Sequence, residues 1–167
     1  MQFSIGIEYA LHCLLYMVDL PLGKTVGIKD LAAFQGVSET YLSKVYTKLR
    51  KAGIINSIPG VNGGYELARL PENITFWNIV EAIEGTTPLF QCAEIRQNEL
   101  LLDKNNLPDT YTKCPCLIKV VMLEGEQQMA QYLSNKTLGW LHEQVNNKIP
   151  KEHLNATTEW FNDIKSR

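Results

Sequence analysis

The chain of 167 residues has the length of one domain, or of one domain with additional helices. Hydrophobic residues make up 45% of it and charged residues 20%, so it can bury a core and is not a disordered tail. No apolar run approaches the roughly 20 residues that a membrane-spanning helix requires. The apolar beginning, MQFSIGIEYALHCLLYM, contains Glu8 and His12 and no early Lys or Arg, which argues against a signal peptide. We therefore expect a soluble, cytoplasmic protein with no membrane partner.

The net charge of −2 at first sight disfavours a nucleic-acid partner, but the charge is unevenly distributed. Residues 1–70 hold seven basic and five acidic side chains, whereas residues 71–167 hold nine and thirteen. Around the middle of the first part lies a basic stripe with Glu66 as its one acid: Lys44, Lys48, Arg50, Lys51 and Arg69. Such a stripe can bind phosphates, because at cellular salt each charge acts over only about 8–10 Å.

The first 53 residues predict three helices. Apolar spacing predicts a helix over 5–19, ended before Pro21, and a short helix over 28–35 that Gly36 ends. Ser38 begins a third helix that ends at Gly53, a residue suited to a helix C-cap. Its expected core side is Tyr41, Leu42, Val45, Leu49 and Ala52.

The rest of the chain predicts a hairpin and further helices. Two β-prone stretches, 54–58 and 65–68, flank a glycine-rich turn. Helices are expected over 76–85, 117–133, 136–147 and 151–165, and residues 86–113 as a loop with a helical turn near 93–101. The predicted fold is mainly α with a small β-wing. Its parts are a winged helix-turn-helix domain (1–85), a cysteine-containing sensor loop (86–116), a dimerisation helix and following helix (117–147) and a tail helix (148–167).

Helix, short turn, helix and two-stranded wing form the DNA-binding winged helix-turn-helix arrangement. The third helix places Thr40, Ser43, Lys44 and Thr47 on one face, which can enter a major groove, while Lys48 and Lys51 are placed for phosphates. The wing glycines allow the backbone to approach DNA closely. The candidate DNA-binding residues are Thr40, Ser43, Lys44, Thr47, Lys48, Lys51, Gly60, Asn62 and Gly63. The alternative is an amphipathic helix with a solvated basic face, followed by an ordinary hairpin.

Four cysteines are too few and too unevenly spaced for a secreted disulfide framework. Cys114 and Cys116 flank a proline, a poor geometry for a disulfide but a plausible metal clamp, and Cys92 could add a third thiolate. Thiolates favour zinc or an iron–sulfur cluster. The alternative is three thiols without a ligand, with Cys13 a small buried apolar residue.

The chain resembles the winged-helix iron–sulfur transcription regulators that include IscR, NsrR and RsrR. The resemblance runs from residue 1 to about residue 139. It rests on GIEYALHC, VSETYLSKVYTKLRKAGII, PGVNGGYELAR, ITFWNIVEAIEG and the pair FQCAEIRQ and KCPC. It implies a homodimer whose long helix, here 117–133, forms the dimer, with a cluster-binding loop before that helix. It also implies base contacts by Thr40, Ser43 and Lys44, whereas Ile58-Pro59-Gly60 replaces the minor-groove Arg that many members carry near the wing tip.

The resemblance also suggests cluster ligands. Cys92, Cys114 and Cys116 are more widely spread than the commonest family pattern. In one branch a Glu and a His of the first helix coordinate a 2Fe–2S cluster together with cysteines of the partner subunit, and Glu8 and His12 match those positions. Residues four apart share a helix face, so one metal centre could meet both side chains, although an ordinary surface pair has the same spacing.

These patterns lead to a non-enzymatic, dimeric regulator of double-stranded DNA whose operator binding depends on an iron–sulfur cluster. A 2Fe–2S cluster is favoured over a 4Fe–4S cluster, and the isolated protein can lack it. Redox state, nitric oxide and iron supply are the candidate signals. The alternatives are a cluster-free regulator that responds to a partner, a small molecule or cysteine oxidation, a structural zinc site, and a small thiol oxidoreductase using Cys114 and Cys116. His142 and His153 are expected at the surface.

Overall fold

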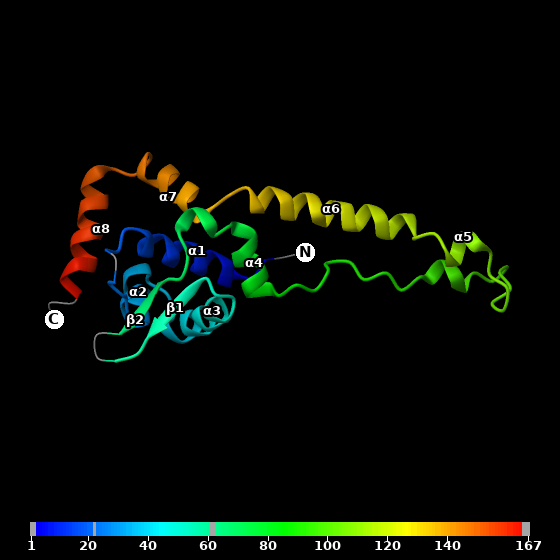
Figure 1. The fold of residues 1–167 in the computed structure, drawn as a ribbon, viewed down its shortest axis with the longest axis horizontal. Helices are drawn as coiled ribbons and strands as arrows, with labels where there is room; N and C mark the ends of the chain where they lie inside the picture. The colour runs from blue at the N-terminus through cyan, green and yellow to red at the C-terminus, as the bar shows by residue number, and fades with distance from the viewer. Residues whose placement is uncertain (1–2, 22, 61–62, 165–167) are drawn as a thin grey trace. The chain divides into compact units, whose positions relative to one another are not determined.

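The computed structural model describes residues 3–21, 23–60 and 63–164. They form two compact units, one made by Thr86–Tyr132 and the other by the described residues of Gln2–Gly85 and Leu133–Arg167. The helices and strands, shown in Figure 1, are α1 (Ile5–Val18), α2 (Ile28–Gln35), α3 (Glu39–Lys51), β1 (Ile55–Ile58), β2 (Gly64–Leu67), α4 (Phe76–Glu84), α5 (Asp109–Thr112), α6 (Leu117–Ser134), α7 (Leu138–Asn146) and α8 (Lys151–Asp163), with short 3₁₀ turns η1 (Pro71–Asn73) and η2 (Ile95–Asn98). The fold is mainly α with a two-stranded wing, as the sequence predicts. No helix in the described part of the chain is long and apolar enough to cross a membrane.

Helix α3 has clear sequence signals at both ends. The Ser38 hydroxyl accepts from the backbone N–H of Tyr41, and three basic residues in the last turn offset the negative end of the helix dipole. Gly53 follows with φ of +66°, a left-handed conformation that ends helices. One face is buried against α1, α2 and α4 by Leu42, Val45, Tyr46 and Leu49.

The wing is an antiparallel pair in which Ile55 faces Leu67 and Ile58 faces Gly64. A third segment joins it, because Val26 and Tyr65 exchange backbone hydrogen bonds of 3.0 and 2.8 Å. This contact requires glycine at position 64, since a Cβ there would lie 2.6 Å from the Val26 carbonyl oxygen. The wing is therefore fastened at its base to the segment between α1 and α2.

Helices α7 and α8, which the sequence analysis placed outside the winged helix-turn-helix part, pack on the same core. Leu138 is fully buried, and its N–H donates to the Ile74 carbonyl over 2.8 Å, while the Phe76 N–H donates to the Lys136 carbonyl. Phe161 of α8 is also buried and stacks with Tyr16 and Phe34. The segments 74–76 and 136–138 are thus hydrogen-bonded to each other, although they lie about 60 residues apart in the chain.

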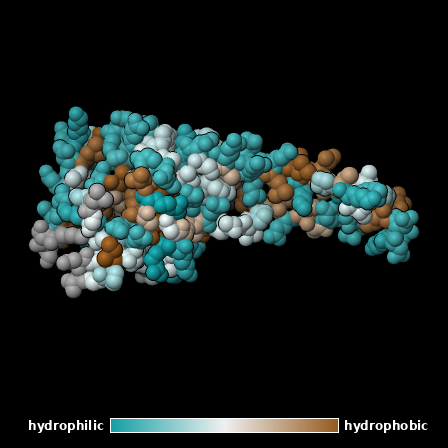
Figure 2. Space-filling model, viewed as in Figure 1, coloured by the Kyte–Doolittle hydropathy of each residue, from teal (hydrophilic) through white to brown (hydrophobic). Residues whose placement is uncertain are grey.

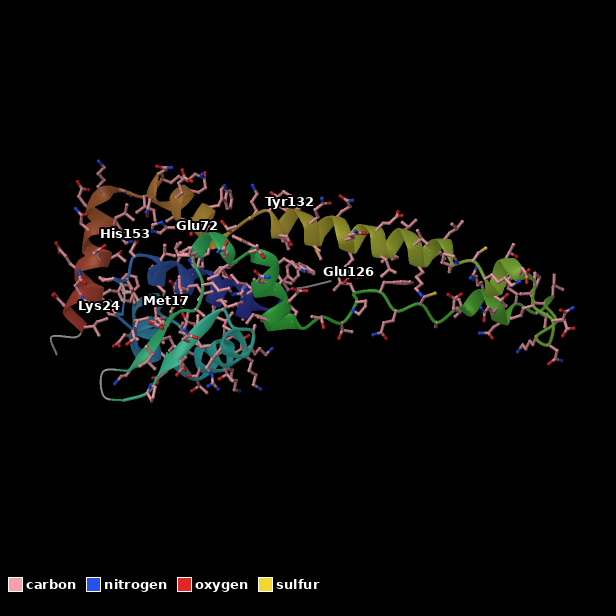
Figure 3. All side chains as sticks on the ribbon, viewed as in Figure 1. Met17, Lys24, Glu72, Glu126, Tyr132 and His153 are labelled. Atoms are coloured by element: carbon pink, nitrogen blue, oxygen red, sulfur yellow. The ribbon has the colours of Figure 1, made fainter. Side chains whose placement is uncertain are left out.

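The other unit consists of an extended segment, η2, α5 and α6. The Leu89 N–H donates to Glu126 Oε2 over 3.1 Å, which holds the extended segment against α6 (Figure 3). Residues 86–113 were predicted as a loop with one helical turn near 93–101, but the structure also has the short helix α5 within this range. Four residues after Pro108 are too few to produce a helical hydrophobic pattern, so only the helix-starting proline could have indicated it.

Candidate nucleic-acid interface and cysteine segment

The polar face of α3 carries the residues expected to meet base edges. Thr40, Lys44 and Thr47 are exposed, and Ser43 is half-buried between them. The Thr47 hydroxyl donates to the Ser43 carbonyl over 2.9 Å, which fixes its rotamer and leaves its oxygen free to accept. The face thus offers one cation and hydroxyl groups along a single helix stripe, a set suited to major-groove edges.

Lys48, predicted from the basic stripe to contact phosphates, also makes a structural hydrogen bond. Its Nζ donates to the Ile83 carbonyl over 2.6 Å, at the C-terminal end of α4. The neighbouring Glu84 carboxylate accepts from the Ser4 hydroxyl over 2.6 Å and from the Ser4 N–H over 2.9 Å. These bonds to Ser4, with a smaller contribution from Lys48, lower the pKa of Glu84. Lys48 and Glu84 thereby tie α3, α4 and the start of α1 together.

Arg69, the last member of the basic stripe, also makes structural hydrogen bonds within the domain. Its Nε donates to the Gly53 carbonyl over 2.9 Å and its Nη2 to the Ala52 carbonyl over 3.2 Å. A guanidinium at the C-terminal end of a helix satisfies carbonyls that the helix leaves open. Arg69 therefore fixes the wing to the end of α3, a partnership between distant residues that no local pattern reveals.

The wing tip is only partly described. Ile58, Pro59 and Gly60 are exposed, while Asn62 lies outside the described residues. A Cβ on Gly63 would collide with the Ile58 carbonyl oxygen, so the backbone there requires glycine. The presence of glycine at position 63 is therefore explained by the backbone conformation and does not require a contact with DNA.

The four cysteines fall into two classes. Cys13 is fully buried in the core, and burial raises the pKa of its thiol to about 12, so it is an apolar packing residue, as expected. Cys116 is buried at the start of α6. Its pKa is lowered, chiefly by the backbone N–H of Lys119 and further by Ile118, Arg96 and the Cys92 thiol. Cys92 also lies 3.7 Å from Glu94 Oε1, and Cys114 is exposed.

Arg96 organises this cysteine segment through contacts with residues 14 to 18 positions away, which no local sequence pattern indicates. Its Nη2 donates to the Cys114 carbonyl over 2.6 Å and to the Tyr111 carbonyl over 3.3 Å, and its Nη1 donates to the Thr110 carbonyl over 3.2 Å. Its Nε pairs with Glu94 over 2.9 Å. Arg96 thus links Glu94 to the turn that precedes Cys114.

The five candidate cluster ligands are divided between the two compact units. Among the described residues, no group of three or more His, Cys, Asp or Glu side chains could hold a metal ion. Cys92, Cys114 and Cys116 belong to the unit Thr86–Tyr132, whereas Glu8 and His12 belong to the other unit, on one exposed face of α1. The described residues of neither unit alone contain all five candidate ligands.

A helix-turn-helix whose second helix presents an exposed polar face beside a two-stranded wing defines the winged-helix class of DNA-binding domains. The profile of the Rrf2 family, described as an iron-dependent transcriptional regulator, matches residues 3–144. The chain belongs to the Rrf2 family of DNA-binding transcriptional regulators.

Individual relatives agree with this assignment. The transcriptional regulator NsrR of Shouchella clausii is 30% identical over 83% of this chain and 86% of its own length. Protein rrf2 of Nitratidesulfovibrio vulgaris is 32% identical over 83% of this chain and 85% of its own length. Among solved structures, CymR, the global cysteine regulator of B. subtilis, has a TM-score of 0.63 at 22% identity, covering 86% of this chain and 97% of its own. IscR of T. potens has a TM-score of 0.63 at 23% identity, covering 90% and 93%. The last two show likeness of fold.

Proposed function

We propose that the protein is a homodimeric, non-enzymatic transcriptional regulator that reads DNA through α3 and the wing. The observation that carries the proposal is the exposed stripe Thr40–Lys44–Thr47 beside the wing, in a chain of the Rrf2 family. Lys51 is exposed in the last turn of α3 and suits a phosphate contact, while Ser43 and Lys48 contribute at the edge of the same surface. Gly60 and Asn62 complete the proposed surface at the wing.

The dimer is proposed from α6. This helix of 18 residues has no buried residue, although much of it is apolar. Leu117 is 79% exposed, Ile118 66% and Val121 65%, and Figure 2 shows hydrophobic residues at the surface over this helix. An apolar face of this size on one helix is stabilised when a second copy covers it. A two-fold dimer would present two α3 helices to two DNA half-sites.

The finer proposal is that an iron–sulfur cluster controls DNA binding. Cys92, Cys114 and Cys116 of one subunit would hold it, with Glu8 and His12 of a second copy completing the ligands. The set fits the chemistry of a cluster, because thiolates and a histidine are its usual ligands.

When bound, a cluster supplies a redox-responsive group whose charge and integrity change with the cell's chemistry. The chain's own residues would convert this change into DNA affinity. Arg96 fixes the turn that bears Cys114, and α1 carries Glu8 and His12 on the helix whose other side packs on α3. Ligation from two subunits would therefore bias the placement of the two α3 helices, which is the coupling that a regulator needs.

The DNA-binding function is tested with the full chain and a pool of random-sequence duplexes. Repeated selection should enrich a near-palindromic sequence. The double variant Thr40→Ala, Lys44→Ala should lose that preference, while Lys104→Ala, a matched change in the other unit, should keep it. Failure of the native chain to enrich any sequence would reject DNA reading by α3.

The cluster is tested separately by anaerobic purification with an absorption spectrum and iron and sulfide assays. We expect iron and sulfide together, and loss of the chromophore in Cys116→Ser, Cys114→Ser and His12→Ala. A single zinc per chain without sulfide would establish a structural metal site instead. A native spectrum in both His12→Ala and Glu8→Ala would exclude the two-subunit site, and a colourless, metal-free protein that still selects DNA would establish a cluster-free regulator.

A further inference from the structure

A cavity of about 620 Å³ lies within the winged-helix unit, between α1, α7 and α8. All three histidines of the chain line it: His12 from α1, His142 from α7 and His153 from α8 (Figure 3 labels His153). His153 is exposed, as the sequence predicts, whereas His142 is half-buried and its Nε2 lies 2.8 Å from Asp19 Oδ1. The cavity is large enough for a small organic molecule.

The electrostatic character of this cavity is negative on one side. Asp19 is the lining's carboxylate, and none of the described residues that line it is Lys or Arg. The C-terminal residues of α1 and of α7 contribute to its wall, and neither helix has a basic residue in its last turn. Open carbonyls at helix C-termini attract cations. The start of α8 has the opposite polarity, but Glu152 in its first turn offsets it.

Lys24 contacts one residue of this lining, Asn162. Its Nζ donates to Asn162 Oδ1 over 3.2 Å, so it is held at the far end of α8 from His153. It therefore does not neutralise Asp19 by direct contact; Asp19 pairs with His142. A carboxylate has a second oxygen and further lone pairs, so Asp19 can accept from a ligand as well as from His142.

The rest of the lining is apolar or neutral. Leu15, Val145, Leu154 and Phe161 supply an apolar wall, and Asn146 and Asn155 supply amide groups. Apolar walls with a few placed polar groups are typical of sites for small molecules.

We propose that this cavity is the binding site of a small organic amine with an apolar body. The ammonium group binds at Asp19 and the carbonyl end of α1, and the apolar body packs on Val145, Leu154 and Phe161. Among the described residues, none of α3 or of the cysteine segment lines the site, which belongs to one compact unit and shares His12 with the proposed cluster ligands.

Occupation of the site has a direct route to the DNA-reading helix. Tyr16 lines the cavity, and its hydroxyl donates to Gln35 Oε1 over 2.6 Å. Gln35 is the last residue of α2 and precedes the turn at Gly36 that leads into α3. A ligand that orders Tyr16 and Gln35 would therefore bias the angle between α2 and α3. This coupling rests on the proposed function, whereas binding of the amine does not.

Binding is tested by proton NMR of the full chain without DNA. The three imidazole signals report on the site, because every histidine of the chain lines it. The probes share one body: phenylethylamine, the corresponding carboxylate 3-phenylpropionate and the neutral amide 3-phenylpropionamide. We expect saturable shifts of the imidazole signals with the amine and at least tenfold weaker binding of the other two. Equal binding of the three probes, or no shift with any of them, would overturn the proposal.

Two variants locate the ammonium and the cavity. Asp19→Asn keeps a residue that helix ends accept, and it should weaken amine binding at least tenfold. Glu143→Gln, an exposed carboxylate of α7 next to His142 that does not line the cavity, is the matched control and should bind as the native chain does. Thr158→Trp on the exposed side of the lining should block the amine by filling the space. Unchanged binding in both Asp19→Asn and Thr158→Trp would place the amine elsewhere and overturn the site.

Coupling is tested last, by titrating the selected DNA duplex with and without saturating phenylethylamine. We expect a change in DNA affinity that Asp19→Asn abolishes. If amine binding is present but DNA affinity is unchanged, the route through Gln35 is wrong while the binding site stands. If the native chain selects no DNA, the proposed function fails independently of the amine.

Discussion

Three lysines of α3 differ in what their ammonium groups contact, and their substitutions should differ accordingly. Lys44→Ala removes a cation from the base-reading face and should cost about 1–3 kcal/mol at one base position. Lys51→Ala should weaken all sequences alike and flatten the salt dependence by about one unit. Lys48→Ala should also lower the free energy of unfolding by about 1–2 kcal/mol, because it leaves the Ile83 carbonyl without its charged donor.

Binding to the selected duplex at several salt concentrations, together with urea unfolding, separates the three lysines. Lys29→Ala, in α2 and outside the proposed DNA surface, is the control. Identical effects of the three variants on affinity and stability would refute the division between base-reading, phosphate-binding and structural roles.

Glu84 predicts a pH dependence of stability. Its pKa is lowered in the folded protein, mainly by the Ser4 hydroxyl bond, so the unfolded chain takes up its proton first as the pH falls. The stabilisation by this carboxylate is fully present above the unfolded value of about 4.5 and is lost as the pH falls through the lower folded pKa. Urea unfolding from pH 6 to pH 3 should show a steeper loss of stability for the native chain than for Glu84→Gln. Glu72→Gln, at an exposed carboxylate of η1, is the comparison, and equal slopes for native chain and Glu84→Gln would contradict the assignment.

At the scale of the element, α6 is a helix with no fully buried residue, on which Leu117, Ile118 and Val121 are exposed. A charge placed on its apolar face should therefore act on association and leave the fold of the monomer intact. Val121→Asp should shift sedimentation from dimer to monomer at micromolar concentration, because it introduces two carboxylates at a symmetric contact. Gln127→Asp, on a different face of the same helix, should remain dimeric. A native chain that sediments as a monomer would remove α6 as a dimer element.

The local sequence of the wing predicts a hairpin, but it does not predict which residues hold the hairpin against the rest of the domain. Its two strands and glycine-rich turn follow from β-prone residues around Pro59, Gly60 and Gly63. Its attachment depends on Arg69 at the end of α3 and on Val26 pairing with Tyr65. Both contacts join residues far apart in sequence, so hydrophobic periodicity does not predict them.

At the scale of the whole molecule, periodic and capped segments were predictable. The helices, the hairpin and the buried positions Leu42, Val45 and Leu49 follow from spacing and from residues such as Ser38 and Gly53. Tyr46 was missed because its ring is buried one position beside the predicted stripe, where its hydroxyl meets Met17. Other features join distant segments of the chain: the bonds of Arg96 to the turn before Cys114, the cavity lined by three histidines, and the packing of α8. Such contacts depend on the tertiary arrangement and have no local signature.

The packing of α8 makes a further prediction. Phe161 lies in a cluster with Tyr16, Phe34 and Trp160, with ring centroids 4.7 to 5.5 Å apart. Phe161→Ala should lower the free energy of unfolding of the winged-helix unit by about 3 kcal/mol, because it leaves a cavity beside α1 and α2. Glu159→Ala, on the exposed side of α8, should change it by less than about 0.5 kcal/mol. Urea unfolding measures both, and a small effect of Phe161→Ala would show that α8 contributes little to this core.

The hydrogen bonds that join Ile74 to Leu138 and Phe76 to Lys136 have a consequence for how the protein is made. The winged-helix unit is discontinuous, since its core is completed by Leu138 and Phe161. On a ribosome the first 85 residues therefore emerge without their final partners, and the cysteine segment follows before α7 and α8 arrive to close the core. The winged-helix unit can fold completely only after the cysteine segment has already been synthesised, so a nascent chain that stops before α7 carries α3 on an incomplete core.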